Sequence, residues 1–523
     1  MAKGREKSDR CIVPQGHRKV SPTVASRRGG KAATESQQAG QLELSFGTAD
    51  SPRGADGGAD GDQSPPGPRA VPKPKRTKGL LLRPMTMEEV ANGDNLRVAF
   101  EHVATNDGAP GPDGQSVSMV REHLDEVLDR LHRELLDGTY RPGPIRRVWI
   151  AKSGGGQRGF GIPDVVDRTV QQAVHQVLSP WYEPTFHASS HGFRPGRSCH
   201  TAIAEAKGHL EEGFEWVVDL DLASFFDRVH HDRLLARLAQ RVHDARVLRL
   251  IRQMLQAKVV LPEGVVVSTK EGTPQGGPVS PLLSNIVLDE LDWELARRGH
   301  RLVRYADDSN IFVRSERAGH RVMESVVRFL EGRLRLSVNA DKSAVARPEE
   351  RHFLGFRLRR DPEGGDVDVL LSARSKERID RKVRELTPRM FGQSIRTCIE
   401  RLNVYLRGWI GFFWICTNAG QQSLEKLDAH IRRRLRAIQL RQWKRPRTIV
   451  AKLVQAGLQP KSAWRFVNGG RRSTWAKSHV TPIYKVLPNR RFAEWGLLSL
   501  ADERYRLQRK HVIGPVQLAL PLG

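Results

Sequence analysis

The adjacent carboxylates of Asp307 and Asp308 are the side chains whose type and spacing suggest chemistry most directly. They lie between two apolar stretches, 302–303 and 311–313. Two like charges a few ångströms apart repel each other, and each loses hydration when it is buried. A fold keeps such a pair mainly when a multivalent cation neutralises it. The apolar flanks predict a β-hairpin with both carboxylates at its turn, and the alternative is a solvated Asp-Asp turn.

A second acidic cluster could complete a metal site. Asp219, Asp221 and Asp227 lie in a stretch where Val and Leu alternate with Asp, which predicts a strand that runs into a turn and a helix. Two metal ions need at least three carboxylate ligands, and the predicted hairpin supplies two. Any of these aspartates could supply the third. The alternative is that they form caps and turns, and this applies first to Asp227.

A Gly-Pro segment at 272–285 could contact a bound nucleotide. The Gly276-Gly277 step allows a close backbone approach to a ligand. Gln275 could contact a base pair or a sugar edge, and Ser280 opens a predicted helix.

A second glycine turn is flanked by Lys152 and Arg158. Two basic side chains around such a turn suit a triphosphate, to which the Arg guanidinium offers a fork of donors. Residues 154–159 also fit a dinucleotide-binding glycine pattern. No acidic residue follows about twenty positions later and no helix clearly opens there, so we reject that interpretation.

The composition indicates a polyanionic partner. The chain has 523 residues, enough for roughly two to four domains with their own cores. Its formal net charge is +27 and its pI about 10.5, so it attracts nucleic acid or a membrane surface. No apolar stretch could span a membrane and no signal-peptide core is visible, which predicts a cytoplasmic location without membrane binding. The four cysteines predict neither a zinc module nor a disulfide framework.

Changes in composition divide the chain. Residues 1–80 are rich in Gly, Ala, Ser, Pro and charge, which predicts a disordered tail. Helical spacing of apolar residues begins at about 85, and strand-like and helical segments alternate to about 370. The remainder is basic and helical, with amphipathic runs at 375–386, 395–407 and 424–441.

The stretch from Lys426 to Arg447 holds nine Lys or Arg and, apart from Asp428, no acidic residue. Apolar residues recur at helical spacing, so we expect one face to pack while the basic face stays in water. Like charges one turn apart destabilise a helix unless a polyanion neutralises them. This favours a nucleic-acid-binding helix over an ordinary solvated one.

The order of these segments resembles the reverse transcriptases encoded by bacterial group II introns. The sequence His191-Gly192-Phe193-Arg194-Pro195-Gly196-Arg197-Ser198 is typical of that family, and residues 427–436 resemble its maturase, or thumb, domain. The resemblance covers roughly residues 85–455. It implies an α+β right-hand polymerase with fingers, palm and thumb. Four regions are expected: the tail at 1–80, fingers and palm at 81–368, a helical thumb at 369–450 and a basic DNA-binding-like region at 451–523.

The resemblance also implies the site residues. In this family the first metal-binding Asp lies five residues before a bulky aromatic, which selects Asp221, before Phe226, over Asp219. Asp221, Asp307 and Asp308 become the catalytic residues. Two Mg²⁺ ions, or Mn²⁺, would be held by Asp221, Leu222, Asp307 and Asp308. The implied dNTP contacts are Lys152, Arg158, Phe226, Gln275 and Lys342. Phe226 would exclude a 2′-hydroxyl, and Lys342 is either a general acid for pyrophosphate or a plain surface lysine.

The partners implied by the resemblance are group II intron RNA, an RNA template/DNA primer duplex, target DNA and dNTPs, near the bacterial nucleoid. The implied nucleic-acid contacts are Arg194, Arg197, Arg432, Arg433, Arg434, Arg436, Arg441, Lys444 and Arg445.

The expected function is RNA-directed DNA polymerisation with assistance to intron splicing and retrohoming. Two alternatives are a domesticated reverse transcriptase in defence or repair, and an RNA-binding splicing cofactor with an unused polymerase. No Cys-ligated His-Asn-His endonuclease is visible, and family precedent then implies priming from a nascent strand at a replication fork.

Overall fold

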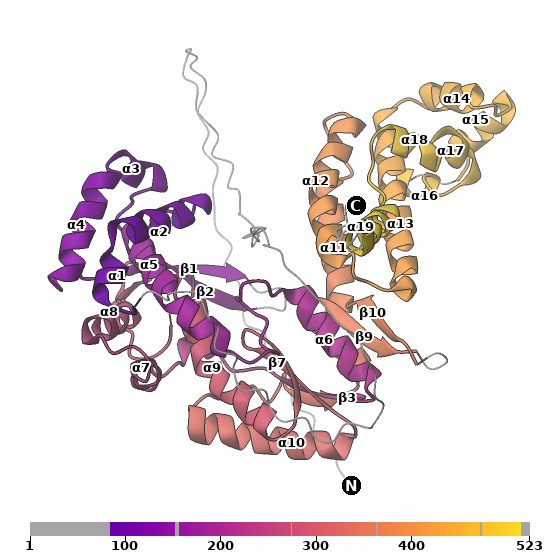
Figure 1. Cartoon of the computed structure of the whole chain (residues 1–523). Helices are drawn as coiled ribbons and strands as arrows, with labels where there is room; N and C mark the ends of the chain where they lie inside the picture. Colours follow the sequence, from indigo (N-terminus) through magenta and orange to yellow (C-terminus); the bar gives the residue numbers. More distant parts are fainter. Residues whose placement is uncertain (1–83, 152–155, 274, 362–364, 471–472, 514–523) are drawn as a thin grey trace, which may run out of the picture. The chain divides into compact units, whose positions relative to one another are not determined.

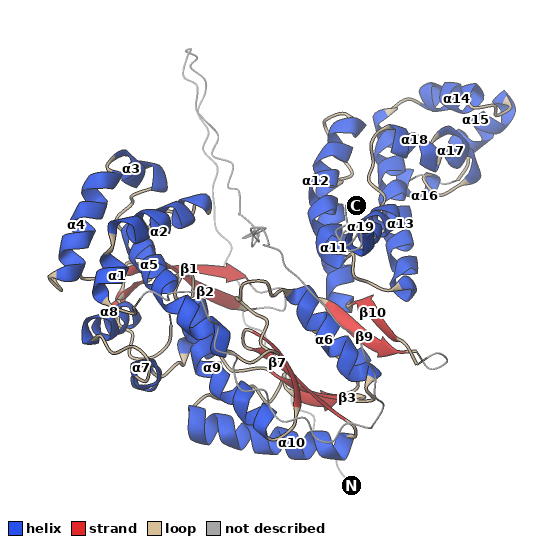
Figure 2. Ribbon diagram, in the orientation of Figure 1, coloured by secondary structure: helices blue, strands red, loops and turns tan. Residues whose placement is uncertain are grey.

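The computed structural model of the chain describes residues 84–151, 156–273, 275–361, 365–470 and 473–513. The predicted tail at 1–80 and the predicted triphosphate ligand Lys152 lie outside the described residues. All described residues belong to one compact unit, Pro72–Gly523. Helices and strands mix up to Leu371, and the described chain is helical from there on (Figure 1 and Figure 2). The predicted mixture of helices and strands with a helical C-terminal region is therefore confirmed.

Helices dominate the N-terminal part of the described chain: α1 Met87–Ala91, α2 Gly93–Thr105, α3 Val117–Glu122, α4 Leu124–Leu136 and α5 Val165–Tyr182. The first three are capped at their N-termini by Thr86, Asn92 and Ser116, whose side-chain oxygens accept hydrogen bonds from first-turn backbone N–H groups. The helical spacing predicted from about residue 85 is confirmed. A small sheet has the strand order β2-β1-β4-β5. Its strands are β1 Ile145–Ala151, β2 Gln157–Ile162, β4 Val259–Val260 and β5 Val266–Val267.

The central sheet carries the acidic residues. Its strand order is β6-β7-β3-β8, with every neighbouring pair antiparallel. The strands are β3 Trp216–Leu220, β6 Arg301–Tyr305, β7 Asp308–Val313 and β8 Ala344–Ala346. Successive residues of these strands enter two different hydrophobic cores: Val218 and Ile311 face one, and Val217 and Phe312 face the other. Both faces of the sheet are covered, which explains the apolar runs that flank the acidic residues.

The remaining elements of this region cover the central sheet or connect its strands. The α-helices are α6 Cys199–Glu211, α7 His231–Ala239, α8 Ala245–Leu255, α9 Ser280–Arg297 and α10 Glu316–Phe329. The short helical turns are η1 Glu183–Thr185, η2 Phe225–Asp227, η3 Leu330–Leu334 and η4 Pro348–Glu350. α10 packs on β3, β7 and β8, and α6 packs on β6. The helix predicted to open at Ser280 is α9.

A hairpin of β9 Phe356–Arg360 and β10 Val367–Leu371 leads into the helical region. The helices are α11 Ala373–Leu386, α12 Ile395–Phe413, α13 Asn418–Gln442, α14 Pro446–Gln455, α15 Pro460–Asn468, α16 Thr474–Lys477, α17 Thr481–Val486, α18 Asn489–Glu494 and α19 Leu500–Ile513. α11 to α13 match the three predicted amphipathic runs. The last helix, α19, returns to pack on α12 and α13 (Figure 1). Asp428 of α13 accepts hydrogen bonds from the backbone N–H groups of Leu500 and Ala501, at the start of α19.

Two expected domain boundaries fall inside regular elements. The boundary at 368 lies within β10, and the boundary at 450 lies within α14. Apolar residues of α11 to α13 share one hydrophobic core with Phe492 and Leu500 from the expected C-terminal region. The helical region after β10 is therefore packed together as a continuous body.

Cys199, Cys398 and Cys416 are free thiols, and Cys11 lies outside the described residues. None of the described helices combines the length and apolar character that crossing a membrane requires.

Candidate functional site

The predicted hairpin is present and sets two carboxylates at one edge of the central sheet. β6 and β7 pair as far as Tyr305 and Asp308, so Ala306 and Asp307 form the turn. Ala306 has φ +58°, a left-handed conformation that is uncommon for alanine and suits a tight turn. Asp307 lies in the turn itself, and Asp308 is the first residue of β7.

Asp221 joins this pair from the neighbouring strand. β3 and β7 are antiparallel, and their pairing ends with Leu220 opposite Ser309. Asp221 directly follows β3, and its charge is near enough to raise the pKa values of Asp307 and Asp308. The Asp221 backbone is fixed, because its N–H donates to Ser343 Oγ at 3.0 Å. The three aspartates expected to hold metal therefore meet at one edge of one sheet.

Asp219 and Asp227 take other roles. The Asp219 carboxylate accepts hydrogen bonds from the Arg351 guanidinium, with nitrogen–oxygen distances of 2.6 and 2.8 Å. Asp219 therefore already has a basic partner within the fold. Asp227 ends η2 with an exposed side chain. These contacts agree with Asp221, rather than Asp219 or Asp227, as the third site carboxylate.

Burial and mutual repulsion raise the pKa values of the Asp307 and Asp308 carboxyl groups. Burial raises the pKa of Asp308 well above its ordinary value, and the charges of Asp219, Asp307 and Asp221 raise it further. Burial also raises the pKa of Asp307. In the described part of the chain no basic side chain forms an ion pair with Asp307 or Asp308. The edge of the sheet thus holds negative charge that its own side chains leave partly uncompensated.

Two basic side chains lie at the rim of this acidic edge. Lys342 Nζ is 3.5 Å from Asp221 Oδ2, and both side chains are partly exposed. Arg158 of β2 is near enough to lower the pKa of Asp307, against the larger effect of burial. Over the described residues, no three Asp, Glu, His or Cys side chains already form a metal-ligand cluster. The donor set itself, several hard carboxylate oxygens with excess negative charge, fits Mg²⁺ or Mn²⁺.

The loop that follows β5 ties the other expected nucleotide contacts to this edge. The Thr273 N–H donates to the Phe226 carbonyl at 2.6 Å, and the Gly161 N–H of β2 donates to the Gln275 carbonyl at 2.6 Å. Phe226 also packs edge-on against Phe225, with ring centroids 5.3 Å apart. Phe226 and Gln275 are therefore positioned through backbone hydrogen bonds, in which the Gln275 side chain takes no part.

The close backbone approach predicted at Gly276-Gly277 is made to the protein itself. Gly276 has φ +118°, and a Cβ there would lie 2.4 Å from the Gly161 carbonyl oxygen. A Cβ on Gly277 would lie 2.2 Å from Gln171 Oε1 of α5. These glycines let the loop pack against β2 and α5, and an approach to a ligand stays a prediction.

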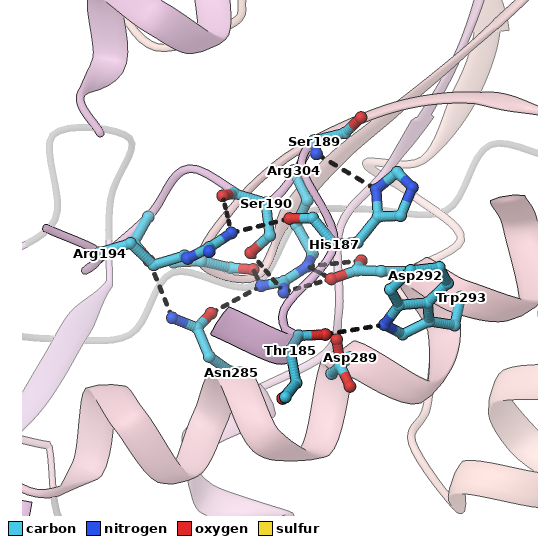
Figure 3. Close-up of polar contacts among 12 residues, drawn as sticks. Thr185, His187, Ser189, Ser190, Arg194, Asn285, Asp289, Asp292, Trp293 and Arg304 are labelled. Atoms are coloured by element: carbon cyan, nitrogen blue, oxygen red, sulfur yellow. Dashed lines mark hydrogen bonds and ion pairs between the residues drawn. The ribbon is translucent and has the colours of Figure 1, made fainter. Parts of the chain in front are cut away.

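Arg304 is the residue that sequence reasoning missed, although it stands in the same motif. Its side chain is fully buried and forms an ion pair with the equally buried Asp292 of α9, at 2.5 Å (Figure 3). It also donates to Asn285 Oδ1 at 2.9 Å, to Ser190 Oγ at 2.7 Å and to the Ala306 carbonyl at 2.9 Å. These bonds use all five guanidinium N–H groups and join the turn to α9.

A signal for this role exists in the sequence. Arg304 directly follows the apolar Leu302-Val303, and arginine is almost never fully buried unless it is paired. The identity of the partner could not be read from the sequence, because Asp292 lies on a different element, twelve positions earlier.

The segment that begins at His191 packs directly on the turn. A Cβ on Gly192 would lie 2.3 Å from the Ala306 backbone nitrogen, so only glycine fits there. The His191 N–H donates to the Arg304 carbonyl at 2.8 Å, and the His191 ring nitrogens contact Thr201 and Glu205. This family-typical segment therefore supports the acidic edge from behind.

Arg194, expected to contact nucleic acid, is instead part of that support. Its guanidinium donates to Glu183 Oε2 and to the carbonyls of Glu183, His187 and Ser190, and its side chain is 8% exposed. Because its donors are used inside the fold, the nucleic-acid role expected for Arg194 is corrected to a structural one. Arg197 is more accessible, with one hydrogen bond to the Ala188 carbonyl.

Two arginines of α13 are also structural. Arg436 is 3% exposed and donates to the Leu487 carbonyl and to Asn489 Oδ1; burial lowers its pKa to about 10. Arg434 donates to the hydroxyl and the carbonyl of Thr387, beyond the end of α11. The expectation that the basic face of this helix stays in water is therefore wrong at these two positions, because neighbouring elements cover them.

The other basic residues expected to bind nucleic acid remain accessible. Arg441, Lys444 and Arg445, around the end of α13, are exposed, and Arg432 and Arg433 are partly exposed. None of these five forms an ion pair with an acidic side chain within the described ranges.

Two family models match the chain. The model described as "Reverse transcriptase (RNA-dependent DNA polymerase)" matches residues 150–358, which contain the acidic edge. The model described as "Group II intron, maturase-specific domain" matches residues 376–454, which contain α12 and α13.

Curated relatives point the same way. Protein YkfC of Escherichia coli K12 is 37% identical over 331 residues, which are 55% of this chain and 86% of YkfC. The group II intron-encoded protein LtrA of Lactococcus lactis is 38% identical over 213 residues, 40% of this chain but only 34% of LtrA. Among solved structures, a partial Cas6-RT-Cas1–Cas2 complex aligns over 47% of this chain and 42% of that chain, with 22% identity and a TM-score of 0.32.

Replacing Asp308 by Asn removes a charge that burial and three nearby carboxylates disfavour. The folded-state pKa is raised, so the ionised carboxyl destabilises the fold at neutral pH. We expect Asp308→Asn to raise the melting temperature in EDTA by about 2–4 °C. Mg²⁺ should then stabilise the wild type by binding the folded state, and stabilise the variant much less. Scanning fluorimetry measures both effects. Asp227→Asn is the control and should leave both unchanged, whereas a lower melting temperature for Asp308→Asn would contradict this electrostatic account.

Removing the ion-pair partner of Arg304 should lower the stability of the fold far more than removing a more exposed carboxylate of the same helix. Asp292→Asn leaves a buried guanidinium without its counter-charge, and we expect the free energy of unfolding to fall by about 3–5 kcal/mol. Glu294→Gln breaks the pairs with Arg297 and Arg298 and should cost much less, because water reaches and screens both pairs. Urea unfolding of both variants is the measurement, and equal losses would rule out a special role for the buried pair.

Proposed function

The chain belongs to the family of group II intron reverse transcriptases and maturases, and from that membership we propose that it extends a DNA primer along an RNA template. It contains an RNA-dependent DNA polymerase domain and a maturase-specific domain. The observation that carries the proposal is the meeting of Asp221, Asp307 and Asp308 at one edge of the central sheet. Carboxylates gathered in this way supply the oxygen ligands that a two-metal nucleotidyl transfer uses.

In this proposal the central sheet is the palm of a right-hand polymerase. The β1–β2 hairpin and the N-terminal helices are its fingers, and α11 to α13 are its thumb. The sheet order supports the palm assignment, because β3 and β7 are neighbours and bring Asp221, which directly follows β3, near Asp308 at the start of β7. The region after α14 is assigned to DNA binding on its basic charge and position.

The three aspartates would hold two Mg²⁺ ions, with Mn²⁺ as a substitute. Bound at this edge, the ions would lower the pKa of the primer 3′-hydroxyl and neutralise charge on the leaving pyrophosphate. Leu222 has a buried apolar side chain, so its contribution would come from its backbone carbonyl. The neighbouring backbone bonds use the Asp221 carbonyl and the Ala223 N–H, and do not involve that carbonyl.

The remaining residues would bind the dNTP. Arg158 would pair with the triphosphate, because its guanidinium lies near enough to Asp307 to affect the pKa of that carboxyl and offers a fork of donors to phosphate. Lys152, which lies outside the described residues, is proposed as a second triphosphate ligand. Phe226 would pack under the sugar and exclude a 2′-hydroxyl, and Gln275 would lie beside the incoming nucleotide. Lys342 would exchange Asp221 for the departing pyrophosphate, to which it could give a proton.

The maturase-specific domain supports a second part of the proposal, that the chain binds group II intron RNA and assists its splicing and retrohoming. The exposed Arg441, Lys444 and Arg445 offer charge to phosphates, and Arg197 adds to it. The target of retrohoming is DNA, so we propose that the protein acts in the cytoplasm beside the bacterial nucleoid.

A primer-extension assay tests the polymerase directly. On poly(rA)/oligo(dT) with Mg²⁺, we expect wild type to incorporate dTTP and the Asp307→Ala/Asp308→Ala double variant to lose at least about a thousand-fold in rate, because it cannot hold the metal ions. Asp227→Ala should keep wild-type activity. Equal incorporation by wild type and the double variant would refute the catalytic assignment. Splicing of an intron RNA should survive in the double variant, so it measures the maturase role separately.

The exposed basic cluster at the end of α13 should determine part of the salt dependence of RNA binding. Replacing Arg441, Lys444 and Arg445 by Gln removes three phosphate contacts. The slope of log affinity against log salt should then become less steep by about 2–3. Filter binding of a structured RNA between 50 and 200 mM salt measures this slope.

The control removes the same number of charges from α10, where Arg317, Arg321 and Arg328 are also exposed. Its slope should match the wild type. If the α10 variant loses as much as the α13 variant, binding is spread over the whole basic surface and the proposed contact is wrong.

A further inference from the structure

A pocket of about 630 Å³ opens beside the buried Arg436, between α13 and the segment 479–489. α13 contributes Arg432, Arg433 and Arg436 to its lining, and the later segment contributes His479, Tyr484 and Asn489. Among the described residues, no acidic side chain lines it. Its size lies within the range of pockets that bind small organic groups.

The charge in this pocket is single-signed and partly unused. Arg432 makes no ion pair within the described part of the chain. The Arg433 guanidinium lies 4.0 Å from the centre of the Trp475 ring, and its buried Nε has no hydrogen-bond partner among the described residues. The nearby Asp428 is turned to the start of α19, where backbone N–H groups bind it. The α13 side of the pocket is therefore suited to bind an anionic group.

The opposite wall offers an aromatic ring and an oriented amide. Tyr484 is 37% exposed, and its hydroxyl is hydrogen-bonded to His479 Nδ1 at 2.5 Å. Arg436 lies 4.6 Å from the Tyr484 ring centre and donates to Asn489 Oδ1 at 2.8 Å. Because the amide oxygen of Asn489 is bound in this way, its NH₂ group remains to donate to a ligand.

We infer that this pocket binds one unpaired nucleotide of a single-stranded nucleic acid. The phosphate would lie beside Arg432 and Arg433, the base would stack on Tyr484, and Asn489 would donate to the base edge. Stacking on an exposed aromatic next to a basic wall is the way proteins hold unpaired bases. The inference rests on the proposed binding of nucleic acid and adds a specific place for one base.

The test uses the full-length protein and fluorescence anisotropy of labelled 12-nucleotide strands, in RNA and DNA form, with base-free strands of the same length. We expect wild type to prefer strands with bases, and Tyr484→Leu to lose about tenfold in affinity for them. Its salt slope should not change, because no charge is removed. Arg432→Gln should make the slope less steep by about 0.7. The strand type with the larger Tyr484 effect identifies the natural source of the nucleotide.

Tyr505→Leu is the matched control. Tyr505 is 46% exposed on α19 and also has an arginine near its ring, with Arg504 5.3 Å from the centre. It lies outside the pocket, so this variant should bind like wild type. Tyr484→Phe keeps the ring and should retain affinity, which separates stacking from misfolding.

Three results would overturn the inference: equal affinity of wild type for strands with and without bases, wild-type affinity in Tyr484→Leu, or no binding of either strand type. A primer-extension assay distinguishes failure of the pocket assignment from failure of the proposed polymerase function. If extension proceeds and Tyr484→Leu binds normally, only the pocket assignment fails. If extension fails while base-dependent binding persists, only the polymerase assignment fails.

Discussion

The buried ion pair of Arg304 and Asp292 is the interaction on which the acidic edge depends. A turn that carries Asp307 beside Asp308 would lower its electrostatic energy by opening, because the two charges repel. The Arg304 guanidinium opposes this, since it donates to the Ala306 carbonyl and is itself fixed to α9. A planar fork with all five donors occupied has little freedom to move. The rigidity of the turn therefore comes from the Arg304–Asp292 ion pair, which solvent does not reach.

The aspartates of the site could be predicted from the sequence because the cost of a carboxylate in an apolar stretch is a local property. For Asp307 and Asp308 the apolar neighbours raised the metal-site hypothesis, and the other motifs favoured it over a solvated turn. The choice between Asp219 and Asp221 could not be made in this way, since the two lie two residues apart in the same alternating stretch, one within β3 and one directly after it. What separates them in the structure is Arg351, which pairs with Asp219 from 132 positions along the chain. The family spacing to Phe226 gave the same choice without that contact.

The helices could be predicted from apolar spacing, but the roles of the arginines could not. A helix with one packed face and one wet face is the simplest outcome of the pattern on α13, and Arg441 follows it. Arg434 and Arg436 do not, because α13 has neighbours on more than one side and the segment 479–489 closes over it. Arg194 shows the same limit: its basic character is evident in the sequence, but the four acceptors around it come from a preceding turn and loop. Burial of a charge is decided by tertiary packing.

The distribution of charge around the site follows from what a polymerase has to bind. Its substrates are polyanions, and a centre of three carboxylates repels them. In the proposed site, Lys342 and Arg158 at the rim would attract the phosphates to the place where the carboxylates would hold cations. Lys342 Nζ lies 3.5 Å from Asp221 Oδ2, so a phosphate bound there would compete with a carboxylate for the same ammonium group. Cations bound to Asp221 would shift that competition toward the phosphate. The acidic centre and the excess of positive charge elsewhere are thus two parts of one electrostatic arrangement.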